Sequence, residues 1–196
     1  MLKKSIVILS ASALALAACG QKTDTTAAND TALATNDTTA FDANTAGTAN
    51  TVAPATGGQA FVNSAAASDA FEIATSKLAL DNSSSAAVKK YANQMITAHT
   101  ASTDKLKATT AGLAPALTPD PKLSAEQQTI VDSLKTKKGA DFDVAYIAAQ
   151  QSGHQQTLDL LRGYAATGDV PALKTFATGL APTVAAHLNM AKALKS

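Results

Sequence analysis

From about residue 60 onward, apolar side chains recur every three or four positions along the chain. This is the spacing of one face of an α-helix, and no run shows the alternation of apolar and polar residues that a half-buried strand requires. The pattern predicts four long helices and one short helix. They span about residues 60–80, 85–111, 124–136, 140–167 and the segment from Asp169 to about 194.

Residues with turn and capping chemistry separate these segments. Asp81 to Ser84 interrupts the first pattern and supplies an N-cap for the second helix, while Ser124 and Gln127 have the spacing of a capping box. Asp169 is predicted to cap the last helix, with Pro171 in its first turn. Pro182 removes one backbone hydrogen bond, so we expect a kink near Gly179 to Pro182.

Helices of about 20 to 27 residues correspond to rods of about 30 to 40 Å. The short connections near Asn82 and Gly168 predict two antiparallel hairpins, and the proline-rich stretch with the short helix forms the longer connection. The predicted fold class is all-α: a ferritin-like four-helix bundle with a short extra helix in the long crossover. A signal peptide and a disordered tether are expected to precede it.

The N-terminus has the features of a secretory signal. Two lysines precede an apolar stretch from Ser5 to Leu16, and Ala17, Ala18 and Cys19 follow. This ending resembles the bacterial lipobox, which implies that residues 1–18 are removed and that Cys19 carries acyl chains. By the same resemblance, Gly20 favours the outer membrane, with the domain facing the periplasm. The alternative is an ordinary secretory signal with a chance cysteine.

Residues 19–59 predict a lipidated cysteine followed by a tether. Thr, Ala, Asn, Asp and Gly dominate residues 20–59, which carry four Asp and one Lys, a net charge of −3. Such a segment buries too little apolar area to offset its ordering entropy, so we expect disorder and a reach of about 35 Å. The alternative is a small folded subdomain. The folded domain is then expected at 60–196.

Composition excludes several classes of function. The net charge of +1 argues against nucleic acid as a partner, and a single cysteine excludes a disulfide framework. No catalytic motif occurs, so no catalytic residue is predicted and an enzyme is disfavoured. The predicted partners are a lipid bilayer, reached through the N-terminal acyl chains, and a protein of the cell envelope. The sequence leaves the oligomeric state open.

The candidate chemistry lies in the three histidines of the chain. His99, His154 and His187 each fall on the apolar stripe of a different long helix, and Glu72 lies beside the stripe of the remaining one. At 1.5 Å per residue from the two hairpin turns, all four reach the middle of the bundle, within about two turns of one another.

Two interpretations of this group remain open. Imidazole and carboxylate are ligands for a transition-metal ion in bundle cores. A ferritin-type di-iron site requires Glu-x-x-His, however, and the residues three positions before the histidines are Ile96, Gln151 and Val184. A structural polar network is therefore favoured and no cofactor is expected, with a transition-metal ion as the alternative. Asp143, Tyr146 and Gln150, near His154 along the chain, are candidates to join the network.

Several short motifs, in order and spacing, resemble one exported bacterial family. They are Phe71–Leu80, Val88–Ala92 with Met95 and His99, Phe142–Ile147, Gly153–Gln155 and His187–Ala191. The similarity covers about residues 61–194 and points to a domain-of-unknown-function family with a ferritin-like helical bundle. The resemblance implies an envelope location and no established reaction.

These observations favour an outer-membrane-anchored lipoprotein with a non-catalytic bundle, acting as an envelope interaction or stress-related module. The alternative is a metal-binding or redox-active bundle that uses Glu72 and the three histidines.

The anchor can be tested by replacing Cys19 with Ser. Because about two acyl chains are needed for stable membrane attachment, the variant should move from the membrane fraction to the soluble fraction after cell lysis. Wild-type-like membrane retention of Cys19→Ser would overturn the assignment of Cys19 as the anchor.

Overall fold

The computed structural model describes residues 57–195, and in this range every regular element is a helix. The all-α prediction is therefore confirmed. The helices are α1 (Gly58–Asn82), α2 (Ala86–Ala111), α3 (Ala125–Lys135), α4 (Gly139–Thr167) and α5 (Pro171–Ala193). Cys19, the predicted signal peptide and most of the predicted tether lie outside the described residues.

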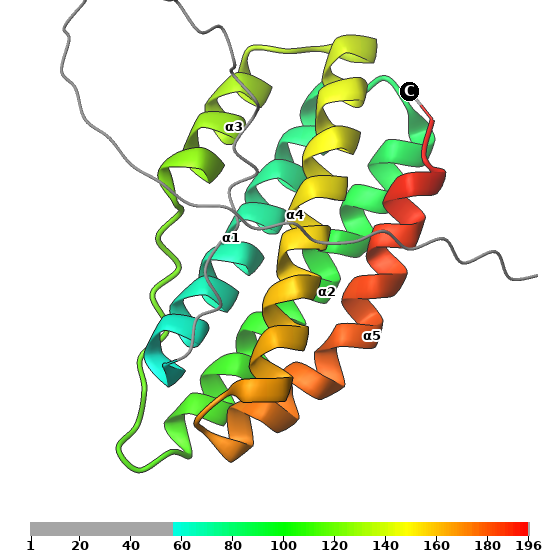
Figure 1. Ribbon diagram of the computed structural model, residues 1–196. Coiled ribbons are helices and arrows are strands. Elements are labelled where there is room, and N and C mark those ends of the chain that lie inside the picture. Colours follow the sequence, from blue (N-terminus) through cyan, green and yellow to red (C-terminus); the bar gives the residue numbers. More distant parts are fainter. Residues whose placement is uncertain (1–56, 196) are drawn as a thin grey trace, which may run out of the picture. The chain divides into compact units, whose positions relative to one another are not determined.

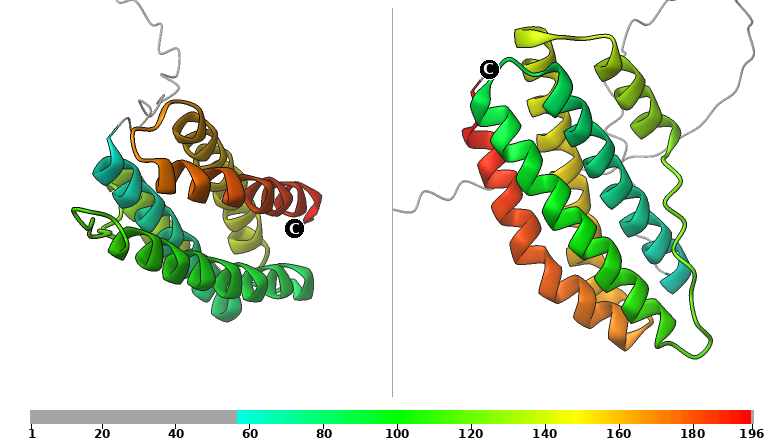
Figure 2. Two further views of the ribbon diagram at one scale, coloured as in Figure 1. Left: turned by 90° about the horizontal axis from the view of Figure 1, so that it is seen from below. Right: turned by 180° about the vertical axis from the view of Figure 1, so that it is seen from behind.

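The four long helices form a bundle (Figures 1 and 2). α1 packs against α2 and α4 packs against α5, each as an antiparallel hairpin, and α1 also contacts α4 while α2 contacts α5. Because α2 and α4 run in the same direction, the chain between them must return along the whole bundle (Figure 1). This return segment carries α3, which lies against α1 and α4.

The helix ends follow the predicted capping chemistry in part. Ser124 and Gln127 form the predicted capping box: the Ser124 hydroxyl accepts the Gln127 N–H at 3.1 Å, and the Gln127 side chain accepts the Ser124 N–H at 2.9 Å. The N-cap of α2 is Ser85, whose hydroxyl accepts the Val88 N–H at 3.4 Å. It thus lies just beyond the segment from which we expected the cap.

Asp169 does not cap the last helix as predicted. The N-cap of α5 is Val170, and no side chain caps this end. Asp169 instead accepts the Tyr164 hydroxyl at 2.7 Å and the Gly58 N–H at 3.3 Å. The carboxylate therefore ties the α4–α5 turn to the start of α1, which begins at Gly58, two residues before the predicted boundary.

α5 continues through Pro182 without ending. Proline lacks a backbone N–H and so removes one hydrogen bond of the helix. The Pro182 side chain is exposed, so its ring takes no place in the core. The kink that we expected at this position stays a prediction.

Two apolar clusters fill the bundle on either side of its middle. One contains Phe61, stacked on Tyr164 with ring centroids 4.0 Å apart and edge-on to Phe176 at 6.4 Å. The other contains Phe142 and Tyr146, whose stacked rings are 5.8 Å apart. Buried polar side chains are interspersed with these apolar residues. They include Asp69, Glu72, Thr75, His99, Ser102, Gln150, His154 and His187.

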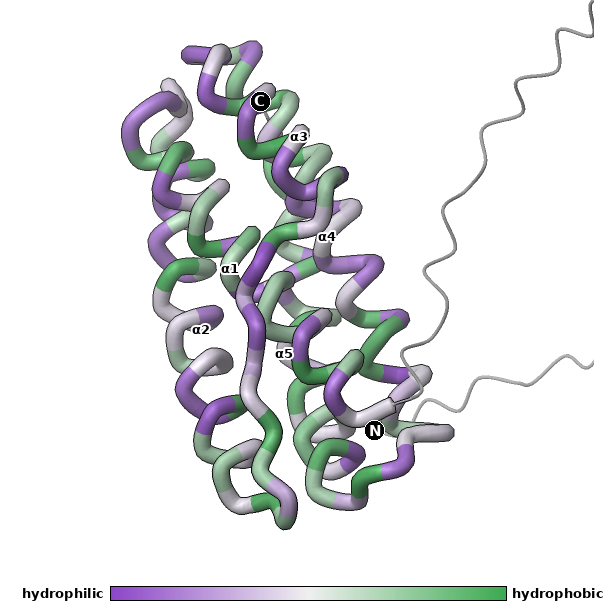
Figure 3. Tube along the Cα trace, turned by 90° about the vertical axis from the view of Figure 1, so that its left-hand side faces the viewer, coloured by the Kyte–Doolittle hydropathy of each residue, from purple (hydrophilic) through white to green (hydrophobic). Residues whose placement is uncertain are grey.

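Polar residues in the interior explain one error in the predicted helix faces. Hydrophilic and hydrophobic positions alternate closely along the helices (Figure 3), and on α1 the apolar residues mark the buried face only in the first half, where Val62 and Ala66 are buried. Ile73 and Leu80 are only partly buried, whereas Glu72 is 1% exposed. Glu72 therefore lies at the centre of the buried face and not beside it.

Among the described residues, none of the helices combines the length and the apolar character needed to cross a bilayer.

The aromatic stack of Phe61 predicts a large effect of its removal. Phe61 is fully buried, so Phe61→Ala leaves a cavity and should lower the free energy of unfolding by about 3–5 kcal/mol, as measured by denaturant titration followed by circular dichroism. Val144→Ala is the matched control because Val144 is 57% exposed, and it should change stability by less than about 0.5 kcal/mol. Equal effects of the two substitutions would contradict this packing.

Candidate metal centre

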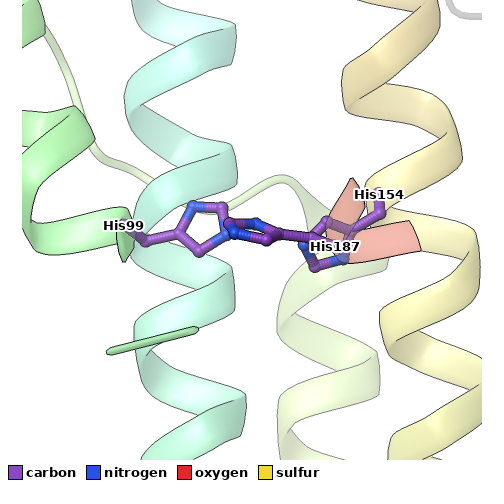
Figure 4. Close-up of side chains that lie close together, drawn as sticks. All are labelled: His99, His154 and His187. Carbon is purple, nitrogen blue, oxygen red and sulfur yellow. The ribbon is translucent and has the colours of Figure 1, made fainter. Parts of the chain in front are cut away.

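Three helices bring the three histidines of the chain together at one level of the bundle. His99 extends from α2, His154 from α4 and His187 from α5, and the side chains approach one another (Figure 4). The ring centroids are 5.5 Å apart for His99–His154, 5.6 Å for His99–His187 and 5.5 Å for His154–His187. One ring nitrogen from each histidine lies within 4.8 Å of the other two. The height estimate made from the helix lengths is therefore correct for the histidines.

His99 is oriented by a carboxylate on α1. Its Nδ1 lies 2.8 Å from Asp69 Oδ1, and Asp69 Oδ2 accepts the Thr103 hydroxyl at 3.3 Å. Asp69 is 5% exposed, so this pair is shielded from water. When Nδ1 donates to the Asp69 carboxylate, a neutral His99 ring presents a lone pair at Nε2. That atom is buried and has no hydrogen-bond partner.

His154 is oriented by the backbone of its own helix. Nδ1 donates to the Gln150 carbonyl oxygen at 2.8 Å, which leaves the lone pair of the neutral ring on Nε2. This Nε2 atom is likewise buried and unpartnered. His99 and His154 are thus held in the same tautomer by different acceptors.

Glu72 lies behind His154 and outside the histidine group. Its Oε1 is 3.4 Å from Nδ1 of His154, the nitrogen already bonded to the backbone, and the converging group of ligand atoms comprises the histidines alone. Gly153 makes room for this carboxylate, because a Cβ at that position would lie 2.8 Å from Glu72 Oε1. The structure therefore places Glu72 where it compensates charge, next to the candidate ligands.

His187 completes the triangle from α5. Its Nδ1 is buried without a hydrogen-bond partner, and its backbone carbonyl accepts the Tyr91 hydroxyl at 3.4 Å. Each histidine therefore contributes at least one buried nitrogen that no other group of the protein satisfies.

Burial keeps two of the rings neutral. It lowers the pKa of His154 to about 3 and the pKa of His187 to about 4, and a positive charge on His99 adds to both effects. Burial also acts to lower the pKa of His99, but the hydrogen bond to Asp69 and the charges of Glu72 and Asp69 outweigh it and raise that pKa. Burial raises the pKa of Glu72 to about 7.

Of the three residues predicted to join a polar network, Tyr146 and Gln150 lie in the interior and Asp143 lies at one end of the bundle. Tyr146 and Gln150 are buried in the interior, where the Tyr146 hydroxyl lies 2.8 Å from Ser76 Oγ and the Gln150 amide donates to Thr75 Oγ1 at 3.1 Å. Asp143 accepts the Ser84 hydroxyl at 3.1 Å, beside the α1–α2 connection. Asp143 therefore stabilises the end of the bundle and does not reach the histidines.

Three converging imidazoles are a donor set that could hold a transition-metal ion. Buried polar atoms in proteins are nearly always satisfied, by protein, water or an ion. Around the histidines seven buried side-chain atoms have no hydrogen-bond partner: His99 Nε2, His154 Nε2, His187 Nδ1, both oxygens of Glu72, Gln150 Oε1 and Ser102 Oγ. Metal-bound histidines characteristically donate their other nitrogen to a carboxylate or a carbonyl, as His99 and His154 do.

Sequence reasoning did not identify Asp69 or Gly153 as parts of this site. Asp69 precedes Glu72 by three residues and therefore shares its helix face, which is a signal that the sequence carries. The role of Gly153 depends on its distance from a side chain of another helix, and no local pattern encodes that distance.

Fold and site together define an all-helical bundle protein with a buried histidine cluster in its interior. The chain belongs to the family described as a domain of unknown function, DUF4142, whose match covers residues 43–194. This confirms the resemblance drawn from the sequence motifs. No curated protein and no solved structure matches the chain significantly.

The lowered histidine pKa values predict how stability depends on pH in the metal-free protein. Between about pH 4.5 and 6.5 the unfolded chain binds protons at His154 and His187 that the native chain largely does not bind, so the free energy of unfolding falls as the pH falls. Native Glu72 keeps a proton that the unfolded chain loses above about pH 4.5. Its effect on the free energy of unfolding has the opposite sign and cancels the contribution of one of the two histidines.

His154→Gln removes one of the two protons that the unfolded chain takes up. Its plot of unfolding free energy against pH in this window should be less steep by about 1.4 kcal/mol per pH unit, measured by denaturant titration in the presence of a chelator. Gln155→Ala, at an exposed position on the same helix, is the control and should keep the wild-type slope. A wild-type slope in His154→Gln would show that His154 does not stay neutral when buried.

Proposed function

We propose that this chain is a lipid-anchored envelope protein whose helical bundle binds one divalent transition-metal ion through His99, His154 and His187. The observation that carries the proposal is the convergence of three buried imidazoles from three helices, with ligand atoms within 4.8 Å of one another. Bonds of about 2.0–2.1 Å to a common ion hold the nitrogens no more than about 4.2 Å apart, so the rings would move inward on binding.

The ligand chemistry selects the class of ion. Imidazole nitrogen suits Zn²⁺, Cu²⁺, Ni²⁺ and Fe²⁺, whereas Ca²⁺ and Mg²⁺ require oxygen ligands. The converging group contains no carboxylate and no thiolate. An ion held by three neutral histidines keeps its double positive charge, and the buried carboxylates of Asp69 and Glu72 lie beside the rings to offset it.

The protonation states support the same assignment. A metal ion competes with protons for the ring nitrogens, so rings with lowered pKa values bind it at neutral pH without a proton to displace. His154 and His187 have such values, and His99 Nδ1 is hydrogen-bonded to Asp69. Only a proton on Nε2 of His99 would need to leave.

The location in the cell rests on the N-terminal sequence. The lipobox-like ending at Cys19 and the Thr- and Ala-rich segment after it support an outer-membrane anchor and a periplasmic domain on a tether. The sequence favoured a non-catalytic interaction or stress-related module at that location. The buried, unpartnered nitrogens favour metal binding, since a protein that uses only its surface has no need of them.

Metal binding is tested on the mature chain carrying Cys19→Ser, which removes both the acyl chains and the only thiol. Isothermal titration with Zn²⁺ and elemental analysis after dialysis should give one ion per chain. Ala in place of any one of the three histidines should weaken binding by more than about 100-fold. Asp69→Asn should weaken it about 10- to 100-fold, because it disturbs the orientation of His99 without removing a ligand.

Two substitutions on exposed positions of α4 are the matched controls. Asp159→Asn repeats the Asp69 change, and Gln155→Ala repeats the truncation to alanine. Both should bind Zn²⁺ like the parent chain. Substoichiometric metal, or a stoichiometry that survives the three histidine substitutions, would reject the metal centre.

A further inference from the structure

A small cavity adjoins the histidine cluster on one side. It measures about 20 Å³, and both His99 and His187 line it, together with Asp69 and Ser102. A cavity needs about 10–15 Å³ to hold one water molecule. This one therefore has room for a single water molecule or for a ligand of similar size.

The cavity has a polar group that no protein partner satisfies. Ser102 is 7% exposed, and its hydroxyl oxygen is buried without a hydrogen bond. Ser102 follows His99 by three residues on α2, so the two side chains share one helix face. The hydroxyl is thus available to a molecule that sits in the cavity.

The cavity also reaches toward the surface between α2 and α5. Its lining includes Ala98 and Leu180, which are partly buried, and Thr183, which is exposed. A small molecule thus has a short route from solvent to the edge of the His99 and His187 rings.

Resting on the proposed function, we infer that the metal ion keeps a fourth coordination position open to this cavity. One exchangeable water molecule, or an oxygen-donor ligand of the same size, occupies it and is hydrogen-bonded by Ser102. Three protein ligands with a water in the fourth position distinguish reactive zinc-type sites from structural sites, in which four protein ligands close the coordination shell. Glu72 does not close the shell, because it lies at Nδ1 of His154.

The charge of the cavity favours a neutral ligand. Asp69 lines it, with one carboxylate oxygen 2.8 Å from Nδ1 of His99, so an anion placed there would face a carboxylate group. Water carries no such penalty, and it can accept a hydrogen bond from Ser102 while binding the ion.

The test uses the Cu²⁺-loaded mature chain and electron paramagnetic resonance in water enriched in oxygen-17. Nitrogen hyperfine structure from three imidazoles reports the metal site, and line broadening by oxygen-17 reports a directly bound, exchangeable water. We expect both signals in the mature chain that carries Cys19→Ser and no other substitution. Three-nitrogen coordination without oxygen-17 broadening would overturn the open position while leaving the metal site intact. Absence of the nitrogen hyperfine structure would overturn the metal site, and this inference with it.

A cavity-filling variant tests whether the bound water lies in this cavity. Ser102→Val removes the hydroxyl and occupies the cavity, so it should keep the nitrogen hyperfine structure and lose the oxygen-17 broadening. Ser152→Val makes the same change on the exposed face of α4 and should keep both signals. Because valine adds volume in the core, Ser102→Ala is measured in parallel, and we expect faster exchange of the bound water in it. Unchanged broadening and exchange in both Ser102 variants would show that the water lies elsewhere.

Discussion

The burial of imidazoles and carboxylates inside an apolar bundle is the constraint on which the rest of this structure depends. Removing such groups from water costs several kcal/mol each unless they are paired or neutral. The aromatic and aliphatic clusters around Phe61 and around Tyr146 supply apolar burial on either side and offset that cost. The long crossover with α3 follows from the same bundle. Because α2 and α4 run in the same direction, the chain that joins them must span the length of the helices.

The polar interior is organised by a small number of contacts. The Asp69 carboxylate and the Gln150 carbonyl each accept a hydrogen bond from Nδ1 of one histidine, and Nε2 of each ring has no hydrogen-bond partner. Gly153 leaves space for Glu72 beside His154, where a larger residue would displace the carboxylate. Burial then keeps His154 and His187 neutral near pH 7. Burial thus leaves two of the three converging rings neutral, while Asp69 favours the protonated form of the third, His99.

Much of this arrangement could be predicted from local pattern, and the exceptions share one cause. Helix positions, the Ser124 capping box and the common height of the three histidines follow from periodicity and helix rise, which depend only on neighbours along the chain. Asp169 was assigned to a cap because capping statistics describe isolated helix ends, but in the folded protein Tyr164 and Gly58 occupy its carboxylate. Glu72 lies beside the apolar stripe in the sequence and is nevertheless fully buried, because an apolar stripe does not reveal a buried face that is itself partly polar.

By itself, the sequence determined the helices, their order and the level at which the histidines meet, because each of these is set by spacing and turn residues. Only the tertiary structure decided which side chains surround them. It brought Asp69 to His99, moved Glu72 out of the ligand group and left a water-sized cavity beside Ser102. The reason is that the rotation of each helix about its axis is set by packing against all its neighbours at once, and that rotation determines which polar atoms face one another.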